Sequence, residues 1–123
     1  YSETVGFNIL GPNKSVLFIP DIDKWDLWQK DIIAEIERND HLFLDATFFD
    51  GTELPGMDMN QIPHPFVVES MQLFANLSIK EKQKIHFIHF NHTNPLYQPG
   101  SNASRVFNSA GFQVAKQGQI FNL

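Results

Sequence analysis

Residues 85–95 read IHFIHFNHTNP, and this stretch decides both the fold and the candidate site of the chain. Its β-branched and aromatic first part predicts a strand, and its Asn- and Pro-containing second part predicts a loop. Because side chains alternate along a strand, His86 and His89 are expected to point to opposite faces, with Phe87 on the face of His89. The even spacing of His86, His89 and His92 therefore does not predict three ligands of one site on a strand.

A helix does not bring the three histidines together either. Residues spaced by three drift around a helix axis, by about 120° over two such steps. The Asn-His-Thr-Asn-Pro segment, residues 91–95, is also a poor helix former. At most two of these histidines can share a site, and for a single strand histidine a solvated or hydrogen-bonded structural role stays open.

The composition places the chain among globular proteins, as one domain or part of a larger one. Hydrophobic residues make up 42% and charged residues 19% of its 123 residues. The net charge of -5 and the absence of a Lys/Arg run argue against nucleic acid as a partner. Without cysteine, thiolate zinc sites and disulfides are excluded, so the five histidines and the carboxylates are the candidate metal ligands.

The sequence contains no recognisable membrane span or targeting segment. No apolar stretch approaches the roughly 18 residues that a bilayer span requires, so no membrane partner is predicted. The first residue is Tyr1 rather than Met, and no charged-then-apolar leader follows it. We expect the start to be truncated, and the compartment stays unknown, with cytoplasmic as the default.

Strand and helix patterns alternate along the chain. Pro20 is expected to end the second strand, and a loop over residues 50–65 is long enough to be functional. The first half is expected to form a hairpin over residues 4–19, a helix from the Asp23 cap to Asn39 with Trp25 and Trp28 on its buried face, and a strand around Asp45. A second helix is expected to open at His64-Pro65, followed by a turn capped by Ser78 and Glu81 and by a strand over 84–90. The last elements expected are a helix over 103–110 closed by Gly111 and a terminal hairpin around Gln117-Gly118.

This alternation predicts an α/β fold, with one mixed sheet and helices on one of its faces. The other face of such a sheet must also be buried by something. One layer of helices does not do this, so we expect a partner for the open face.

Three polar residues fall at the ends of apolar strands: Asp21, Asp45 and His89. Strand ends that face connecting loops are where α/β folds place their sites. Each residue also has a structural alternative. Asp21 can serve the turn that follows its strand, although Asp23 is the better cap, and Asp45 can bond the backbone amides of its own loop.

The order of LFIPDID (17–23), LDATF (44–48), IPHPFVVES (62–70) and FIHFNHTNP (87–95) resembles the second half of the metallo-β-lactamase fold. More narrowly, FIHFNHTNP and the Asp-x-Thr of LDATF are similar to the coenzyme PQQ synthesis protein B family. The similarity runs from about residue 5 to the end. It implies that residues 1–123 are one partial domain, the C-terminal half of a metallo-β-lactamase-type αββα sandwich.

The resemblance also implies metal ligands. Asp21 matches the aspartate that bridges two metals in binuclear members, and His89 matches the last histidine ligand. An aspartate at Asp21 departs from the synthesis-protein branch, where this strand often ends without one, and resembles the hydrolytic members. The implied cofactor is zinc or another divalent metal.

Further roles follow for the remaining matches. Asp45 and His64 match the acidic and histidine positions that tRNase Z-type relatives keep near the scissile phosphate, where they orient substrate or assist proton transfer. The signature loop is expected to organise itself or to contact a small-molecule substrate, through Asn91, His92, Thr93 and Asn94.

The His-x-His-x-Asp-His motif of the superfamily has no equivalent in these residues. A catalytic zinc normally has three protein ligands and an open position, and a binuclear site needs about six or seven. Asp21 and His89 alone predict weak or absent metal and no turnover. The expected partners are the missing half of the domain or further copies of this chain in a homo-oligomer.

The sequence is compatible with three functions. The parent protein is a metal-dependent hydrolase whose metal activates water, or it is a non-catalytic carrier or binding protein in pyrroloquinoline quinone biosynthesis or transport. The third alternative is a non-catalytic α/β half-domain that assembles with itself to bury the open face.

Overall fold

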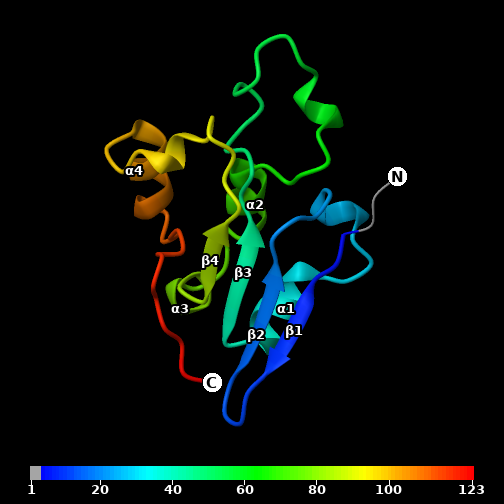
Figure 1. Ribbon diagram of the computed structural model, residues 1–123, viewed down its shortest axis with the longest axis vertical. Helices are drawn as coiled ribbons and strands as arrows, with labels where there is room; N and C mark the ends of the chain where they lie inside the picture. The colour runs from blue at the N-terminus through cyan, green and yellow to red at the C-terminus, as the bar shows by residue number, and fades with distance from the viewer. Residues whose placement is uncertain (1–3) are drawn as a thin grey trace.

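The computed structural model describes residues 4–123 and contains one four-stranded mixed sheet (Figure 1). The strands β1 (Phe7–Leu10), β2 (Ser15–Ile19), β3 (His41–Asp45) and β4 (Ile85–Ile88) lie side by side in that order. β1 runs antiparallel to β2, whereas β2, β3 and β4 are parallel. The expected first hairpin and the mixed α/β sheet are confirmed.

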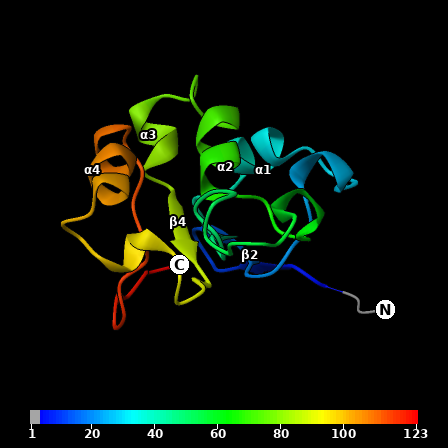
Figure 2. The same cartoon turned by 90° about the horizontal axis from the view of Figure 1, so that it is seen from above.

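Four α-helices connect and flank the strands, and they lie on one side of the sheet (Figure 2). They are α1 (Ile32–Arg38), α2 (Val67–Leu73), α3 (Ile79–Lys82) and α4 (Asn102–Ser109), with short 3-10 turns η1 (Trp25–Leu27), η2 (Met59–Gln61) and η3 (Pro95–Tyr97). The side chain of Ser78 accepts a hydrogen bond from the Glu81 amide, as expected for the cap of α3. Gly111 follows α4 with a positive φ of 95°, which favours glycine, so the expected end of that helix is also confirmed.

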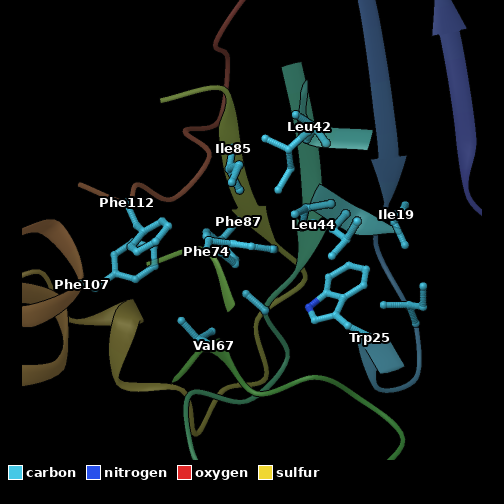
Figure 3. Close-up of a cluster of buried hydrophobic side chains, with 14 of the residues drawn as sticks. Ile19, Trp25, Leu42, Leu44, Val67, Phe74, Ile85, Phe87, Phe107 and Phe112 are labelled. Carbon is cyan, nitrogen blue, oxygen red and sulfur yellow. The ribbon is translucent and has the colours of Figure 1, made fainter. Parts of the chain in front are cut away.

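The core lies between the helices and the sheet face that they cover (Figure 3). β3 and β4 contribute alternate residues to it, which is the periodicity that a strand dictates. Aromatic side chains from α4 and the segment after it close one end, where the rings of Phe87 and Phe107 lie 5.4 Å apart. The fully buried strand residues of this core are Leu42, Leu44, Ile85 and Phe87.

The helix expected from Asp23 to Asn39 is wrong. The chain forms only the η1 turn, becomes extended at Trp28, and begins α1 after Asp31, whose side chain accepts from the Ile33 amide. Asp31 is therefore the cap, while Asp23 accepts from the neighbouring Lys24 amide. The expected core role of the tryptophans holds for Trp25, which is buried and donates to Ser70 Oγ.

The start of α2 also differs slightly from expectation. His64 and Pro65 precede the helix, whose N-cap is Phe66 and whose first residue is Val67. The amide of Phe66 donates to the Glu69 carboxylate, so the first turn of α2 is capped without a proline inside it. His64 is therefore a loop residue, held outside the helix.

The expected terminal hairpin is absent from the described residues. Gly118 does turn the chain, but Val114 forms a lone parallel bridge to Phe87, and the carbonyl of Leu123 accepts from the amides of Asn13 and Lys14. The end of the chain, red in Figure 1, thus runs back to the β1–β2 turn. A side chain at Gly11 would collide with Leu123, so this close approach requires glycine.

The terminal segment covers part of the second sheet face. Phe121 packs on His41, Phe43 and His86, with ring centroids 4.7, 5.3 and 4.9 Å away. His86 points to this face as expected, is only 4% exposed, and finds no hydrogen-bond partner for either ring nitrogen within residues 4–123. Burial and the nearby His41 lower the pKa of His86 to about 4. His86 is therefore a neutral, apolar packing residue here.

Candidate metal centre

The polar residues predicted at the strand ends gather at the carboxyl edge of the parallel strands. Asp21 follows β2, Asp45 ends β3, and His89 comes directly after β4. His64 arrives from the long loop between β3 and α2. Parallel strands end at the same edge of a sheet, so short connections suffice to bring these side chains together.

Asp45 is the buried centre of this group. Its Oδ2 accepts from the Ile22 amide at 3.0 Å and lies 2.7 Å from His64 Nδ1. Its Oδ1 accepts from the Thr47 amide at 2.8 Å and from the Thr47 hydroxyl at 2.7 Å. A carboxylate offers about four acceptor positions, so these contacts use the acceptor capacity of Asp45. Asp45 therefore bonds to its own loop, as the structural alternative expects, and it also contacts His64.

His64 lies between two carboxylates. Its Nδ1 is 2.7 Å from Asp45 and 3.5 Å from Asp21 Oδ1, and ligand atoms of the three residues all lie within 4.8 Å of one another. The hydrogen bond to Asp45 raises the pKa of His64 against the effect of burial, and the charges of Asp45, Asp21 and Asp23 add to the rise. His64 therefore holds a proton at Nδ1 more tightly than a free histidine does.

The distances separate two kinds of contact. The 2.7 Å from His64 Nδ1 to Asp45 is a direct hydrogen bond, whereas Asp21 Oδ1 at 3.5 Å faces the same nitrogen as a more distant charged neighbour. Carboxylate oxygens and imidazole nitrogens are suitable zinc ligands, so the Asp21 carboxylate and the Nε2 atom of His89 could hold a divalent metal, while Asp45 orients His64.

His89 joins this group through Thr47. The hydroxyl of Thr47 lies 3.1 Å from His89 Nδ1 and 3.2 Å from His64 Nδ1, and the two imidazole centroids are 6.2 Å apart. His64 is thus near both Asp21 and His89, the two residues for which metal binding is predicted. The bridging role of Thr47 was missed in the sequence, although the Asp-x-Thr motif that contains it was noticed.

The signature loop after β4 packs on the loop after β3. The Asn91 amide donates to the Thr47 carbonyl at 2.9 Å, and Asn94 Nδ2 donates to the Ala46 carbonyl at 2.7 Å. Asn94 is buried and caps η3, which supports the loop-organising alternative for this residue.

The outer part of the same loop is tied down by an acidic residue that the sequence did not single out. Thr93 Oγ1 accepts from Asn91 Nδ2 at 2.7 Å and donates to Glu53 Oε1 at 3.0 Å. Glu53 also accepts from the amides of Phe49 and Asp50. His92 is exposed, and its predicted substrate contact stays a prediction, as do those of Asn91 and Thr93.

A mixed sheet with helices on one face and an Asp-Asp-His cluster at its carboxyl edge define an α/β domain with a candidate metal centre. No family model matches this chain. It is 25% identical over 128 residues to coenzyme PQQ synthesis protein B of Rhizobium meliloti (strain 1021), across 98% of this chain and 40% of that protein. Its fold matches zinc-bound PqqB from Methylobacterium extorquens with a TM-score of 0.77 at 24% identity, over 98% of this chain and 44% of the other.

The two comparisons confirm the predicted resemblance to coenzyme PQQ synthesis protein B and to its fold. The chain spans less than half the length of both relatives. In residues 4–123, no helix is long and apolar enough to cross a membrane.

Proposed function

We propose that this chain is part of a metal-dependent hydrolase related to coenzyme PQQ synthesis protein B, acting in the synthesis of that quinone cofactor. The names of the two relatives support the pathway, and the zinc in one of them supports the metal. The observation that carries the proposal is the convergence of Asp21, Asp45 and His64 within 4.8 Å at the carboxyl edge of the sheet.

Asp21 and His89 would hold the metal. Asp21 presents a half-exposed carboxylate at the cluster, and carboxylate oxygens are suitable zinc ligands. His89 uses Nδ1 toward Thr47, so its Nε2 is left for a ligand. A bound zinc ion supplies a Lewis acid that lowers the pKa of water from 15.7 toward about 7.

Asp45 and His64 would move the proton. The buried carboxylate fixes the imidazole through Nδ1 and raises its pKa, which favours the charged form of His64. A charged imidazole is a general acid for a leaving group, and after proton loss it is a general base. The signature loop, with His92 exposed at its surface, would contact a small-molecule substrate.

Residues 1–123 would bind metal weakly and turn over no substrate by themselves. The sequence lacks His-x-His-x-Asp-His, and a catalytic zinc normally takes three protein ligands. We propose that the other ligands, and the layer over the second sheet face, come from the remaining part of a metallo-β-lactamase-type domain. Residues 1–123 form one unit, the C-terminal half of that domain.

Zinc titration calorimetry on this chain and on a longer protein that contains it tests the proposal. Asp21→Ala and His89→Ala should each lower zinc affinity at least 10-fold, because each removes one of few ligands. Asp26→Ala, a change of an exposed aspartate in η1, is the matched control and should leave affinity unchanged. Full zinc affinity in both ligand variants would exclude this metal site.

The carrier alternative is separated by activity rather than by metal. A carrier of the quinone or its precursor would bind it with the metal present and would hydrolyse nothing. His64→Gln should abolish hydrolysis by the longer protein while zinc affinity falls little, if the proton-transfer role is correct. If the unmodified protein binds a quinone but hydrolyses no substrate, the carrier is favoured.

A further inference from the structure

We propose that Thr47 is a positioning residue that fixes the tautomer of His89, so that the proton sits on Nδ1 and the lone pair of Nε2 is free for a ligand. The assignment of the tautomer stands on hydrogen-bond geometry alone, whereas its use in metal binding rests on the proposed function. Neither the sequence motif nor the relatives assign this role to the threonine.

The proton positions follow from a count of donors. Thr47 Oγ1 has one hydrogen and lies 2.7 Å from the Asp45 carboxylate, which has only lone pairs to offer when ionised. The hydroxyl therefore donates to Asp45, at the short distance typical of a charge-assisted O–H···O⁻ bond. Its oxygen is left as an acceptor, so His89 Nδ1 at 3.1 Å must be the donor.

The same count gives His64 its proton at Nδ1. This nitrogen faces Asp45 Oδ2 at 2.7 Å and Thr47 Oγ1 at 3.2 Å, both of which are acceptors. His64 thus has two partners that demand Nδ1–H, whereas His89 has Thr47. A change at Thr47 should therefore affect His89 strongly and His64 little.

Thr47 is held in place from several sides. Its amide donates to Asp45, its carbonyl accepts from the Asn91 amide, and the preceding carbonyl of Ala46 accepts from Asn94. The residue is buried at 9% exposure, which leaves its hydroxyl little freedom to turn toward water. The hydroxyl is thus fixed relative to β3 and to the loop that carries His89.

The backbone of His89 indicates a constrained position. Its φ of 68° is left-handed, and His89 is the one residue other than glycine with a positive φ among residues 4–123. Such a conformation is strained for a residue other than glycine and persists where surrounding contacts determine it. It places the ring toward Thr47, and the hydrogen bond then selects which ring nitrogen is free.

Long-range ¹H–¹⁵N NMR of the ring nitrogens tests the assignment on this chain without metal, at a pH where both rings are neutral. In the unmodified chain, His89 and His64 should both show a protonated Nδ1 and the high-frequency ¹⁵N signal of an unprotonated Nε2. In Thr47→Val, His89 should lose its preference for Nδ1–H, while His64 keeps it through Asp45. Thr47→Ser, which retains the hydroxyl, should restore the His89 signals.

A matched control comes from a second Asp-x-Thr turn in the same chain. The Thr52 hydroxyl donates to Asp50 Oδ1 at 2.7 Å and its amide donates at 2.9 Å, but both residues lie on the exposed loop. Thr52→Val should leave both rings unchanged. Protonation of His89 at Nε2 in the unmodified chain would overturn the proposal, as would an unaltered Nδ1–H in folded Thr47→Val.

If Thr47→Val does not fold, protonation of His89 at Nε2 in the unmodified chain or in Thr47→Ser still overturns the proposal. Failure of the metal proposal is recognised separately. If the His89 signals behave as expected but zinc leaves them unshifted in a longer protein that contains this chain, the tautomer assignment stands and the proposed metal function fails. If zinc binds but His89 carries its proton on Nε2, the role of Thr47 is wrong.

Discussion

His64 Nδ1 lies 2.7 Å from Oδ2 of Asp45, a carboxylate with no exposed surface. Their separation of 19 residues makes the pair a product of tertiary structure. Asp45 stabilises the charged imidazole and raises the pKa of His64 above 6.5. The pair is therefore a buried, hydrogen-bonded contact that only the folded chain creates.

Replacing Asp45 by Asn should lower the pKa of His64 toward 6.5, because an amide attracts the imidazolium ion less than a carboxylate does. A ring-proton NMR titration measures this change. The free energy of unfolding should also fall by about 1–3 kcal/mol, since the Ile22 and Thr47 amides lose a charged acceptor. Asp50→Asn, in the exposed turn, is the control, and an unchanged His64 titration in Asp45→Asn would contradict the assignment.

The stabilising effect of the His64 pair should depend on pH with a defined sign. A raised folded pKa gives stability that is fully present below the unfolded value of 6.5 and is lost as pH rises through the folded pKa. Urea unfolding of the unmodified chain and His64→Gln should thus differ more below pH 6.5 than well above it. A difference that grows with rising pH would contradict the stabilising role of the His64 pair.

His86 should have the opposite effect on stability. Its pKa of about 4 in the folded chain lies below 6.5, so the unfolded chain binds more protons and stability falls as pH drops from 6.5 to about 4. The loss from this residue is at most about 3 kcal/mol. His86→Phe should remove this acid sensitivity in urea unfolding, while His92→Gln, a change of an exposed histidine, should retain it.

Asn94 should be needed for stability, because its side chain joins the loop after β4 to the loop after β3. Asn94→Ala leaves the buried Ala46 carbonyl and the Leu96 amide without their partner, at a cost of about 1–3 kcal/mol. Asn102→Ala, at the exposed start of α4, should change the free energy of unfolding by less than about 0.5 kcal/mol. Equal effects of the two substitutions in thermal or urea unfolding would contradict this account.

The second sheet face should make the chain associate with itself in the absence of another partner. Phe7 and Ile9 are 56% and 46% exposed, and their register with Phe18 and Val16 puts them on the face opposite the helices. Sedimentation velocity should show oligomers that dissociate in a Phe7→Ser, Ile9→Thr double variant. Leu27→Ser, on the exposed η1 turn, is the control, and a monomeric unmodified chain would exclude this interface.

Local patterns in the sequence predicted the four strands of the sheet, the Ser78 cap, the end of α4 at Gly111 and the opposite orientations of His86 and the core residues of β4. They also predicted that Asp21, Asp45 and His89 come at strand ends. These features depend on side-chain periodicity and capping over a few residues. Local signals therefore suffice to predict them.

Tertiary structure decided which of these residues meet. The contacts of Thr47 with His64 and His89 span 17 and 42 residues, and no local pattern encodes such separations. The break before α1 and the return of Leu123 to the β1–β2 turn likewise depend on packing against the sheet. Hydrogen bonds between loops form only after the parallel strands have brought their carboxyl ends to one edge, which is why the role of Thr47 became visible only in the folded chain.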